Sequence, residues 1–333
     1  MANTQEAIAW ILLNSDKLRL KIKNKDWIKE VFPDYVDVAC SIQLDLNLPE
    51  SFGSGAAPSQ DLALCKSFAE ALEREAVFET KMKTSNGFAA HLDQKNAEIN
   101  ASNELLERHL FLSRFLLNKP FLKIPEKVLF ENSWYRNVQI WANKNGLRFE
   151  LYSLGYNGCL ALTRGEDARN PFGLVVSTAI KGSIQDSMLG SSIECLRRSY
   201  FYLNQESVVD SHSLSLQDFL KIDRPTFGDH GRLGLNIEYS KSLSDLFSNE
   251  EESLSNIDSG PQLPKIDFQN VYLPKIEAYK GCPYAFVQAQ SDLLQQMFLG
   301  VPSENKINLN ALSRFAGKNI DFADINKTPH PFD

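Results

Sequence analysis

The pattern of apolar and polar residues changes several times along the chain between a helical period and a strand period. Apolar residues recur every three to four positions in one short and three long stretches, which predicts amphipathic helices. These stretches are residues 5–14, the segment that follows residue 59, residues 93–116 and residues 184–203. Alternating or continuous apolar runs predict strands at residues 17–23, 36–48, 147–153, 159–163, 172–179 and 270–274. The mixture predicts an α+β (mixed α/β) protein.

Segments without either period are expected to be loops. Residues 51–59 are rich in Gly and Ser and predict a loop, but no Gly-Lys-Ser/Thr follows, so this is not a Walker-type phosphate loop. Residues 84–87 predict a turn, and residues 120–135 an irregular segment. Residues 241–263 are rich in Ser, Glu and Asp and predict an exposed, mobile acidic loop. The two prolines near the end, Pro329 and Pro331, predict a stiff, extended tail that is either a disordered linker or docked into something.

The three long helices share a charged motif. Its copies are Glu70, Glu73 and Arg74; Glu104, Glu107 and Arg108, which lie 34 residues later; and, more loosely, Glu194, Arg197 and Arg198. Small residues precede each copy on the same helix face, at Ala63 and Ser67, Ala97 and Ala101, and Ser187 and Ser191. Leu64, Phe68 and Leu72 lie on the opposite face of the first helix and are expected to face the core.

This motif has two interpretations. Glu and Arg four residues apart stabilise an exposed helix by a few tenths of a kcal/mol, so a single copy is most simply a solvated ion pair. Three copies bordered by small residues instead suggest carboxylates with room for something to approach, and buried carboxylates require cations or hydrogen-bond donors. On this second interpretation, Glu70, Glu73, Glu104 and Glu107 form a magnesium and phosphate site.

Composition limits the class of protein. The 333 residues, with 43% hydrophobic and 23% charged residues, can bury a large core. A net charge of −7 argues against a nucleic-acid or membrane-surface protein. Five cysteines without a metal-type spacing favour free thiols in a reducing compartment. The apolar run of residues 7–13 is too short to cross a membrane and is not preceded by basic residues, so we expect a cytoplasmic protein.

Taken together, the motifs resemble those of the YcaO superfamily, particularly the members that form azoline rings in ribosomally made peptides. The resemblance rests on the three Glu-bearing helices, on the sequence from Ser85 through Asn86 and Gly87 to Ala90, and on the ending from Pro329 to Phe332. It spans about residue 55 to the end, which predicts a YcaO-like domain of residues 55–333 preceded by an N-terminal part, residues 1–54, of the same lobe. The resemblance implies Glu-rich helices packed on mainly antiparallel sheets. The chain departs from the family pattern at His91, Asn96 and Arg197.

The resemblance also implies a reaction and its residues. ATP would activate a backbone amide of a precursor peptide, and cyclodehydration of Cys, Ser or Thr would give a thiazoline or oxazoline. The residues implied in binding ATP and Mg²⁺ are Glu70, Glu73, Arg74, Asn86, Glu104, Glu107, Arg108, Glu194 and Arg198. Pro329 and Pro331 would place the carboxylate of Asp333 as the proton acceptor.

The same resemblance implies partners and leaves alternatives open. Besides the precursor peptide, we expect a leader-peptide-binding protein of the ubiquitin-activating-enzyme type or a similar kind, because the segment before residue 55 is too short to supply that function. A flavin-dependent azoline oxidase and a homodimer are further implied partners. The alternatives are a non-catalytic scaffold of the same fold and an enzyme that forms a thioamide or amidine.

Overall fold

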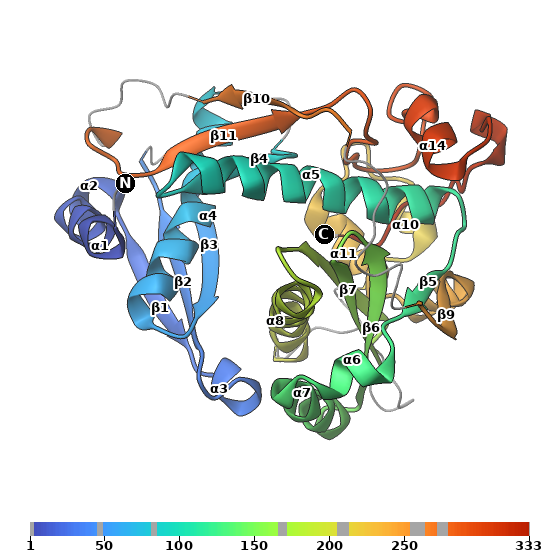
Figure 1. Cartoon of the computed structure of the whole chain (residues 1–333), viewed down its shortest axis with the longest axis horizontal. Coiled ribbons are helices and arrows are strands. Elements are labelled where there is room, and N and C mark those ends of the chain that lie inside the picture. Colours follow the sequence, from blue (N-terminus) through green and yellow to red (C-terminus); the bar gives the residue numbers. More distant parts are fainter. Residues whose placement is uncertain are drawn as a thin grey trace. The chain divides into compact units, whose positions relative to one another are not determined.

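The computed structural model describes residues 3–44, 49–80, 85–165, 172–204, 213–253, 264–271 and 279–332, without the side chains of residues 78–80 (Figure 1). Contacts divide the chain into two units, and each is assembled from two separate segments. Unit 1 comprises Met1–Leu105 and Ile266–Ser291, and unit 2 comprises Leu106–Lys265 and Asp292–Asp333. The division falls inside one helix, whereas the boundary predicted after residue 54 falls inside a strand. Within the described parts of the chain, every helix is too short or too polar to span a lipid bilayer.

In its described residues, unit 1 combines five helical segments with two small antiparallel sheets. Its helices are α1 Thr4–Leu13, α2 Ser15–Leu18, α3 Ile28–Val31, α4 Gln60–Thr80 and the first half of α5 Gln94–Leu116. Its strands are β1 Lys21–Lys25, β2 Val36–Ile42, β3 Ser51–Ala57, β4 Phe88–His91, β10 Asp267–Asn270 and β11 Ala285–Gln290. The strand orders are β1-β2-β3 and β10-β11-β4. Its core contains Phe68, Leu72, Phe88 and Phe286, so the predicted core face of the first long helix is confirmed.

The Gly/Ser-rich segment before α4 is a strand, and the prediction of a loop was wrong. β3 pairs with β2 along its whole length. A Cβ built on Gly53 would lie 1.9 Å from the Ser67 carbonyl oxygen, and one built on Gly55 would lie 2.3 Å from that of Ala63. The glycines are therefore required because the backbone of β3 lies directly against α4. The small residues on this face of α4 accommodate the strand.

The basic segment near the N-terminus also differs from its prediction. Residues 15–18 are the short helix α2, Arg19 follows with a left-handed φ of 47°, and the strand begins only at Lys21. β1 is almost entirely exposed rather than half-buried, and even Ile22 is 43% exposed. β10 ends at Asn270, where the predicted strand of residues 270–274 begins, and residues 272–278 lie outside the described part of the chain.

Unit 2 is built around a five-stranded sheet. Its strands are β5 Phe121–Lys123, β6 Leu147–Gly155, β7 Gly158–Gly165, β8 Leu174–Ile180 and β9 Phe247–Glu251. Its helices, besides the second half of α5, are α6 Glu126–Phe130, α7 Ser133–Lys144, α8 Ile184–Leu203, α10 Leu216–Phe219, α11 Phe227–Gly234, α12 Ile237–Ser242, η1 Ser244–Leu246, α14 Leu309–Ala316 and η3 Phe322–Asp324. The order is β8-β7-β6-β5-β9, and among the described strand pairs only β5 and β9 run parallel. The predicted α+β class with mainly antiparallel sheets is confirmed.

Two segments of unit 2 were predicted to be irregular and are not. Residues 120–135 contain β5, α6 and the start of α7, and residues 244–251 of the predicted acidic loop form η1 and β9. Aromatic packing explains the two strands, because Phe121 of β5 and Phe247 of β9 stack with ring centroids 5.7 Å apart. Residues 254–263 of that loop lie outside the described residues. By contrast, the predicted helix of residues 184–203 is α8, which packs on β7 and β8.

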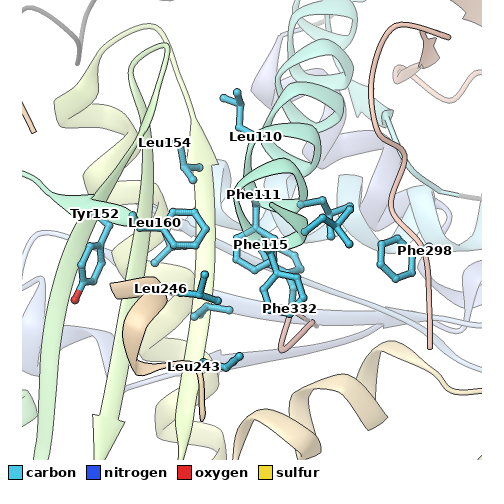
Figure 2. Close-up of a cluster of buried hydrophobic side chains, with 14 of the residues drawn as sticks. Leu110, Phe111, Phe115, Tyr152, Leu154, Leu160, Leu243, Leu246, Phe298 and Phe332 are labelled. Atoms are coloured by element: carbon cyan, nitrogen blue, oxygen red, sulfur yellow. The ribbon is translucent and has the colours of Figure 1, made fainter. Parts of the chain in front are cut away.

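The core of unit 2 joins the second half of α5 to the sheet and to the C-terminal tail. Figure 2 shows Phe111 and Phe115 of α5 beside Phe332 of the tail and near Leu154 and Leu160 of the sheet. Phe332 is 1% exposed. The tail is therefore docked onto the protein, which selects one of the two alternatives that its prolines left open.

Candidate functional site

The first Glu motif lies on α4 and holds two strands of unit 1. Glu70 accepts a hydrogen bond from the Ser54 amide of β3 at 2.7 Å and pairs with Arg74 at 2.6 Å. Glu73 accepts one from the Ala90 amide of β4 at 2.6 Å. The Glu70–Arg74 pair is the exposed i, i+4 ion pair of the simpler interpretation, whereas Glu73 points inward. Both carboxylates are positioned by backbone amides, which fixes their direction.

The environment of Glu73 disfavours the ionised form of its carboxyl group. Burial, with the negative charges of Glu104 and Glu70 nearby, raises the pKa of Glu73 well above its usual value, although Ala90 and Arg74 act in the opposite direction. Like charges disfavour ionisation of a carboxylate, and a divalent cation would relieve that repulsion. Asn86 is buried in the turn before β4, in the same unit.

The second group of predicted residues lies in unit 2. Glu107 of α5 accepts a hydrogen bond from the Thr178 hydroxyl at 2.5 Å and lies 3.3 Å from the Arg108 guanidinium. Burial raises the pKa of Glu107; Arg108 opposes this shift and Glu194 adds to it. Glu194 is exposed on α8. Glu104 and Glu107 are three residues apart on one helix, so they lie on neighbouring turns.

The cationic residues of unit 2 meet the C-terminal tail. The Arg108 guanidinium stacks 4.1 Å from the centroid of the Phe332 ring, and that of Arg198 lies 6.0 Å from it. Arg198 also donates to the Val176 carbonyl at 3.3 Å. Pro329 and Pro331 lie in the docked tail, while Asp333, the predicted proton acceptor, lies outside the described residues.

The donor chemistry of these groups fits a hard divalent cation, because the residues are carboxylates whose charges repel one another. Within the described ranges, however, no three His, Cys, Asp or Glu side chains are gathered closely enough to form a ready-made metal site. The assignment of Glu70, Glu73, Glu104 and Glu107 as ligands therefore stays a prediction.

Sequence reasoning missed the residues that orient this chemistry. Thr178 interrupts the apolar run of β8 next to Ser177, and two hydroxyl residues in a fully buried strand were the available signal. His230 of α11 and Tyr239 of α12 hydrogen-bond to the tail, and the Tyr239 hydroxyl donates to the Pro329 carbonyl. Neither residue belongs to a repeated motif, and their contacts span 100 and 90 residues of sequence.

Comparison with known proteins gives a match only at the level of structure. No protein-family model matches the chain, and no curated protein sequence matches it. The structure of YcaO from Methanopyrus kandleri bound with AMPPCP and Mg²⁺ is similar over 87% of this chain and 90% of that chain, with a TM-score of 0.53 and 11% identity. The chain therefore has the YcaO fold, as its motifs predicted.

Two further structures with this fold are more similar. A heterocyclase in complex with substrate and cofactor aligns with a TM-score of 0.62 and 9% identity over 97% of this chain, which spans only 57% of the heterocyclase. A chain of the E. coli microcin synthetase McbBCD complex with pro-MccB17 bound aligns with a TM-score of 0.61 and 10% identity, covering 94% of this chain and 96% of that one.

Proposed function

We propose that this chain is an ATP-dependent enzyme that activates a backbone amide of a precursor peptide, and that its product is a thiazoline or oxazoline. The observation that carries the proposal is the carboxylate of Glu73, half-buried on a Glu-rich helix and raised in pKa beside Glu70 and Glu104, in a chain with the YcaO fold. Such a carboxylate lowers the stability of the folded state unless a bound cation or a proton compensates its negative charge.

The proposed roles follow from the chemistry of each side chain. Glu70, Glu73, Glu104 and Glu107 are the proposed magnesium ligands. Magnesium would supply charge neutralisation of the ATP phosphates. The proposed phosphate-facing or ligand-orienting residues are Arg74, Asn86, Arg108, Glu194 and Arg198.

In the proposed reaction, a Cys, Ser or Thr side chain of the peptide attacks the preceding carbonyl carbon, and the carbonyl oxygen receives the γ-phosphoryl group of ATP. The new bond from the side-chain sulfur or oxygen, which gives up its own proton, closes the ring. Phosphate then leaves with the former carbonyl oxygen, and the amide nitrogen loses its proton, so that a C=N bond forms within the ring. Asp333 is the proposed proton acceptor, and the fixed φ of Pro329 and Pro331 limits the conformations of the segment before it. A leader-peptide-binding protein, an azoline oxidase and a second copy of the chain are proposed partners.

A non-catalytic scaffold is the second candidate, and specific contacts favour it. Both Glu70 oxygens are engaged, one by Ser54 and one by Arg74, and Arg198 is engaged by a backbone carbonyl. Residues that are satisfied within the protein do not need a nucleotide. Binding of ATP by the wild-type protein separates the two candidates, because only the enzyme requires it.

The test uses the purified chain with candidate partners and peptide. ATP turnover and the loss of one water mass per ring are measured for the wild type and for the double variant Glu104→Gln, Glu107→Gln. We expect the double variant to lose both activities by about 100-fold or more, because phosphoryl transfer depends on the bound metal. Glu98→Gln, the same change on the same helix at a residue that contacts Gln94, is the matched control and should keep both activities. Full activity in the double variant would exclude the metal assignment.

A further inference from the structure

The C-terminal tail is held by side chains whose roles are not explained by nucleotide or metal binding. Residues 329–332 are all buried, and His330 and Phe332 are 0% and 1% exposed. Tyr239 of α12 donates to the Pro329 carbonyl, and His230 of α11 contacts the His330 carbonyl. The tail is thus held by two helices that lie before it in the sequence of unit 2, in addition to the packing of Phe332.

The hydrogen bonds determine the protonation state of both imidazoles. His230 Nδ1 lies 2.6 Å from the His330 carbonyl oxygen and must donate, and its Nε2 accepts from the Gly300 amide at 2.7 Å. His330 Nε2 donates to the Phe298 carbonyl at 2.7 Å, and its Nδ1 accepts from the Phe332 amide at 3.3 Å. Each ring therefore has one donor and one acceptor, so both are neutral, with opposite tautomers.

The two rings also stack on each other. Their centroids are 4.2 Å apart and their planes differ by 17°. Phe219 lies edge-on to His230 and Phe298 lies edge-on to His330. The positive charge of Arg108 acts on His330, and the negative charge of Asp229 acts on His230. Two stacked cations in this place would repel each other and would each direct an N–H group at a backbone N–H donor.

We propose that His230 is a positioning residue that, together with His330, latches the tail onto unit 2 only while both imidazoles are neutral. Protonation of His230 would turn Nε2 into a donor facing the Gly300 amide, and protonation of His330 would do the same at Nδ1 facing Phe332. Acidification therefore releases the tail. An effect of this release on catalysis rests on the proposed function, whereas the latch itself does not depend on that function.

The other titratable groups around the pair do not reverse this behaviour. Burial lowers the pKa of His330 well below its usual value, and the neighbouring His230 and the cationic Arg108 of α5 add to this shift. Asp229 of α11 precedes His230 and its negative charge acts on that residue, but its carboxylate also accepts hydrogen bonds from the backbone and side chain of Thr226 and pairs with Arg232, which partly neutralises it. Tyr239 of α12 stays neutral, because burial raises the pKa of its hydroxyl.

The first test measures the tail directly. Hydrogen–deuterium exchange of the amides in residues 328–332, corrected for intrinsic rates, is followed between about pH 7 and about pH 5. We expect protection to be lost on acidification in the wild type. At pH 7, His230→Phe, which keeps an aromatic ring but removes both hydrogen bonds, should accelerate tail exchange by about tenfold or more, and the smaller change His230→Asn, which keeps a donor, should accelerate it less.

A matched pair of tyrosine variants separates the latch from general loss of stability. Tyr239→Phe removes the donor to the tail and should accelerate tail exchange by about fivefold. Tyr284→Phe removes a buried donor to the Cys65 carbonyl in unit 1 and should leave tail exchange unchanged. Equal acceleration by both variants, or wild-type exchange in His230→Phe, would overturn the proposal.

The second test reads the tautomers. Nitrogen NMR of the histidine rings at neutral pH should show protonated Nδ1 in His230 and protonated Nε2 in His330, and a doubly protonated ring in either residue contradicts the latch. If the proposed function also holds, His230→Asn should lower kcat more than it raises the KM for ATP. Altered tail exchange in a protein without ATP turnover would support the latch and contradict the proposed function. Unaltered tail exchange in a protein that turns over ATP would support the proposed function and contradict the latch.

Discussion

At the scale of single residues, the repeated Glu motif is a set of carboxylates aimed by backbone amides and hydroxyls. Glu70, Glu73 and Glu107 receive hydrogen bonds from Ser54, Ala90 and Thr178, respectively. The spacing of the motif singled out these carboxylates in the sequence, and their role as metal ligands stays a prediction. The spacing did not reveal the hydrogen-bond donors to these carboxylates, because the donors lie on strands that meet the helices only in the folded structure.

The raised pKa of Glu73 predicts that its charge destabilises the ligand-free protein. At pH 7 an ionised Glu with a raised folded-state pKa costs stability, since stability falls as the pH rises from the unfolded pKa towards the folded one. Glu73→Gln keeps an acceptor for the Ala90 amide and removes the charge. It should raise the Tm by about 2–4 °C, for a gain near 1 kcal/mol.

Differential scanning fluorimetry checks this prediction and links it to function. The wild type should gain thermal stability from Mg²⁺ and ATP together, whereas Glu73→Gln should not, because a ligand that binds only the folded state stabilises it. Glu98→Gln on α5 serves as the control and should behave as the wild type. A lower Tm in Glu73→Gln would show that the carboxylate is already compensated.

At the scale of elements, small residues mark places where backbones approach closely. The sequence showed Ala63 and Ser67 on one face of α4 and suggested space beside the carboxylates. The structure fills that space with β3, whose Gly53 and Gly55 have no side chains to separate it from the helix. Gly and Ser are also typical of loops, so local sequence alone could not distinguish a strand packed on a helix from a loop.

Gly53→Ala is therefore expected to be strongly destabilising. Its Cβ would lie 1.9 Å from the Ser67 carbonyl oxygen and 2.5 Å from the Ala71 amide nitrogen, and both are backbone atoms that cannot rotate away. We expect a loss of about 3 kcal/mol in the free energy of unfolding. Urea unfolding measures it as a lower midpoint with an unchanged m-value.

The matched control is Gly182→Ala, because nothing lies within 4 Å of a Cβ at that position. Its free energy of unfolding should stay within about 0.5 kcal/mol of the wild type. If both alanine variants unfold at the same urea concentration, β3 does not pack against α4 as described.

At the scale of the whole molecule, the sequence predicted the α+β class and the YcaO fold but not how the chain divides. The division into units falls between Leu105 and Leu106, inside α5. Nothing in the helical pattern of α5 indicates it, since a continuous helix carries no composition change at such a point. The short strands β5 and β9 were missed for a related reason, because aromatic contacts between distant segments stabilise them, among them the stacking of Phe121 on Phe247.

Buried histidines make the stability of the protein fall as the pH falls. Burial lowers the pKa of His109 to about 4, and that of His330 is lowered as well. The unfolded chain binds protons at these residues near pH 6.5, so their contribution to stability is lost as the pH falls from about 6.5 to about 4. Glu73 and Glu107 act in the opposite direction, because their raised pKa values favour proton uptake by the folded state.

Urea unfolding as a function of pH isolates the histidine contribution. His109 Nδ1 accepts a hydrogen bond from the Gln295 amide, and His109→Gln keeps an acceptor without the titration. Over this pH interval the variant should lose up to about 3 kcal/mol less stability than the wild type. Parallel stability curves for the two proteins would show that His109 does not titrate differently in the folded and unfolded states.

The pairing of β4 with β11 has a consequence for how the protein folds during translation. β4 is made early, but its partner strand, residues 285–290, is made only after β5 to β9 of unit 2. Until then the rings of Phe68 and Phe88 lack Tyr284 and Phe286, against which they pack in the finished protein. Unit 1 therefore has an unpaired strand edge at β4 during most of translation, and we expect this edge to need a chaperone until residues 285–290 have been made.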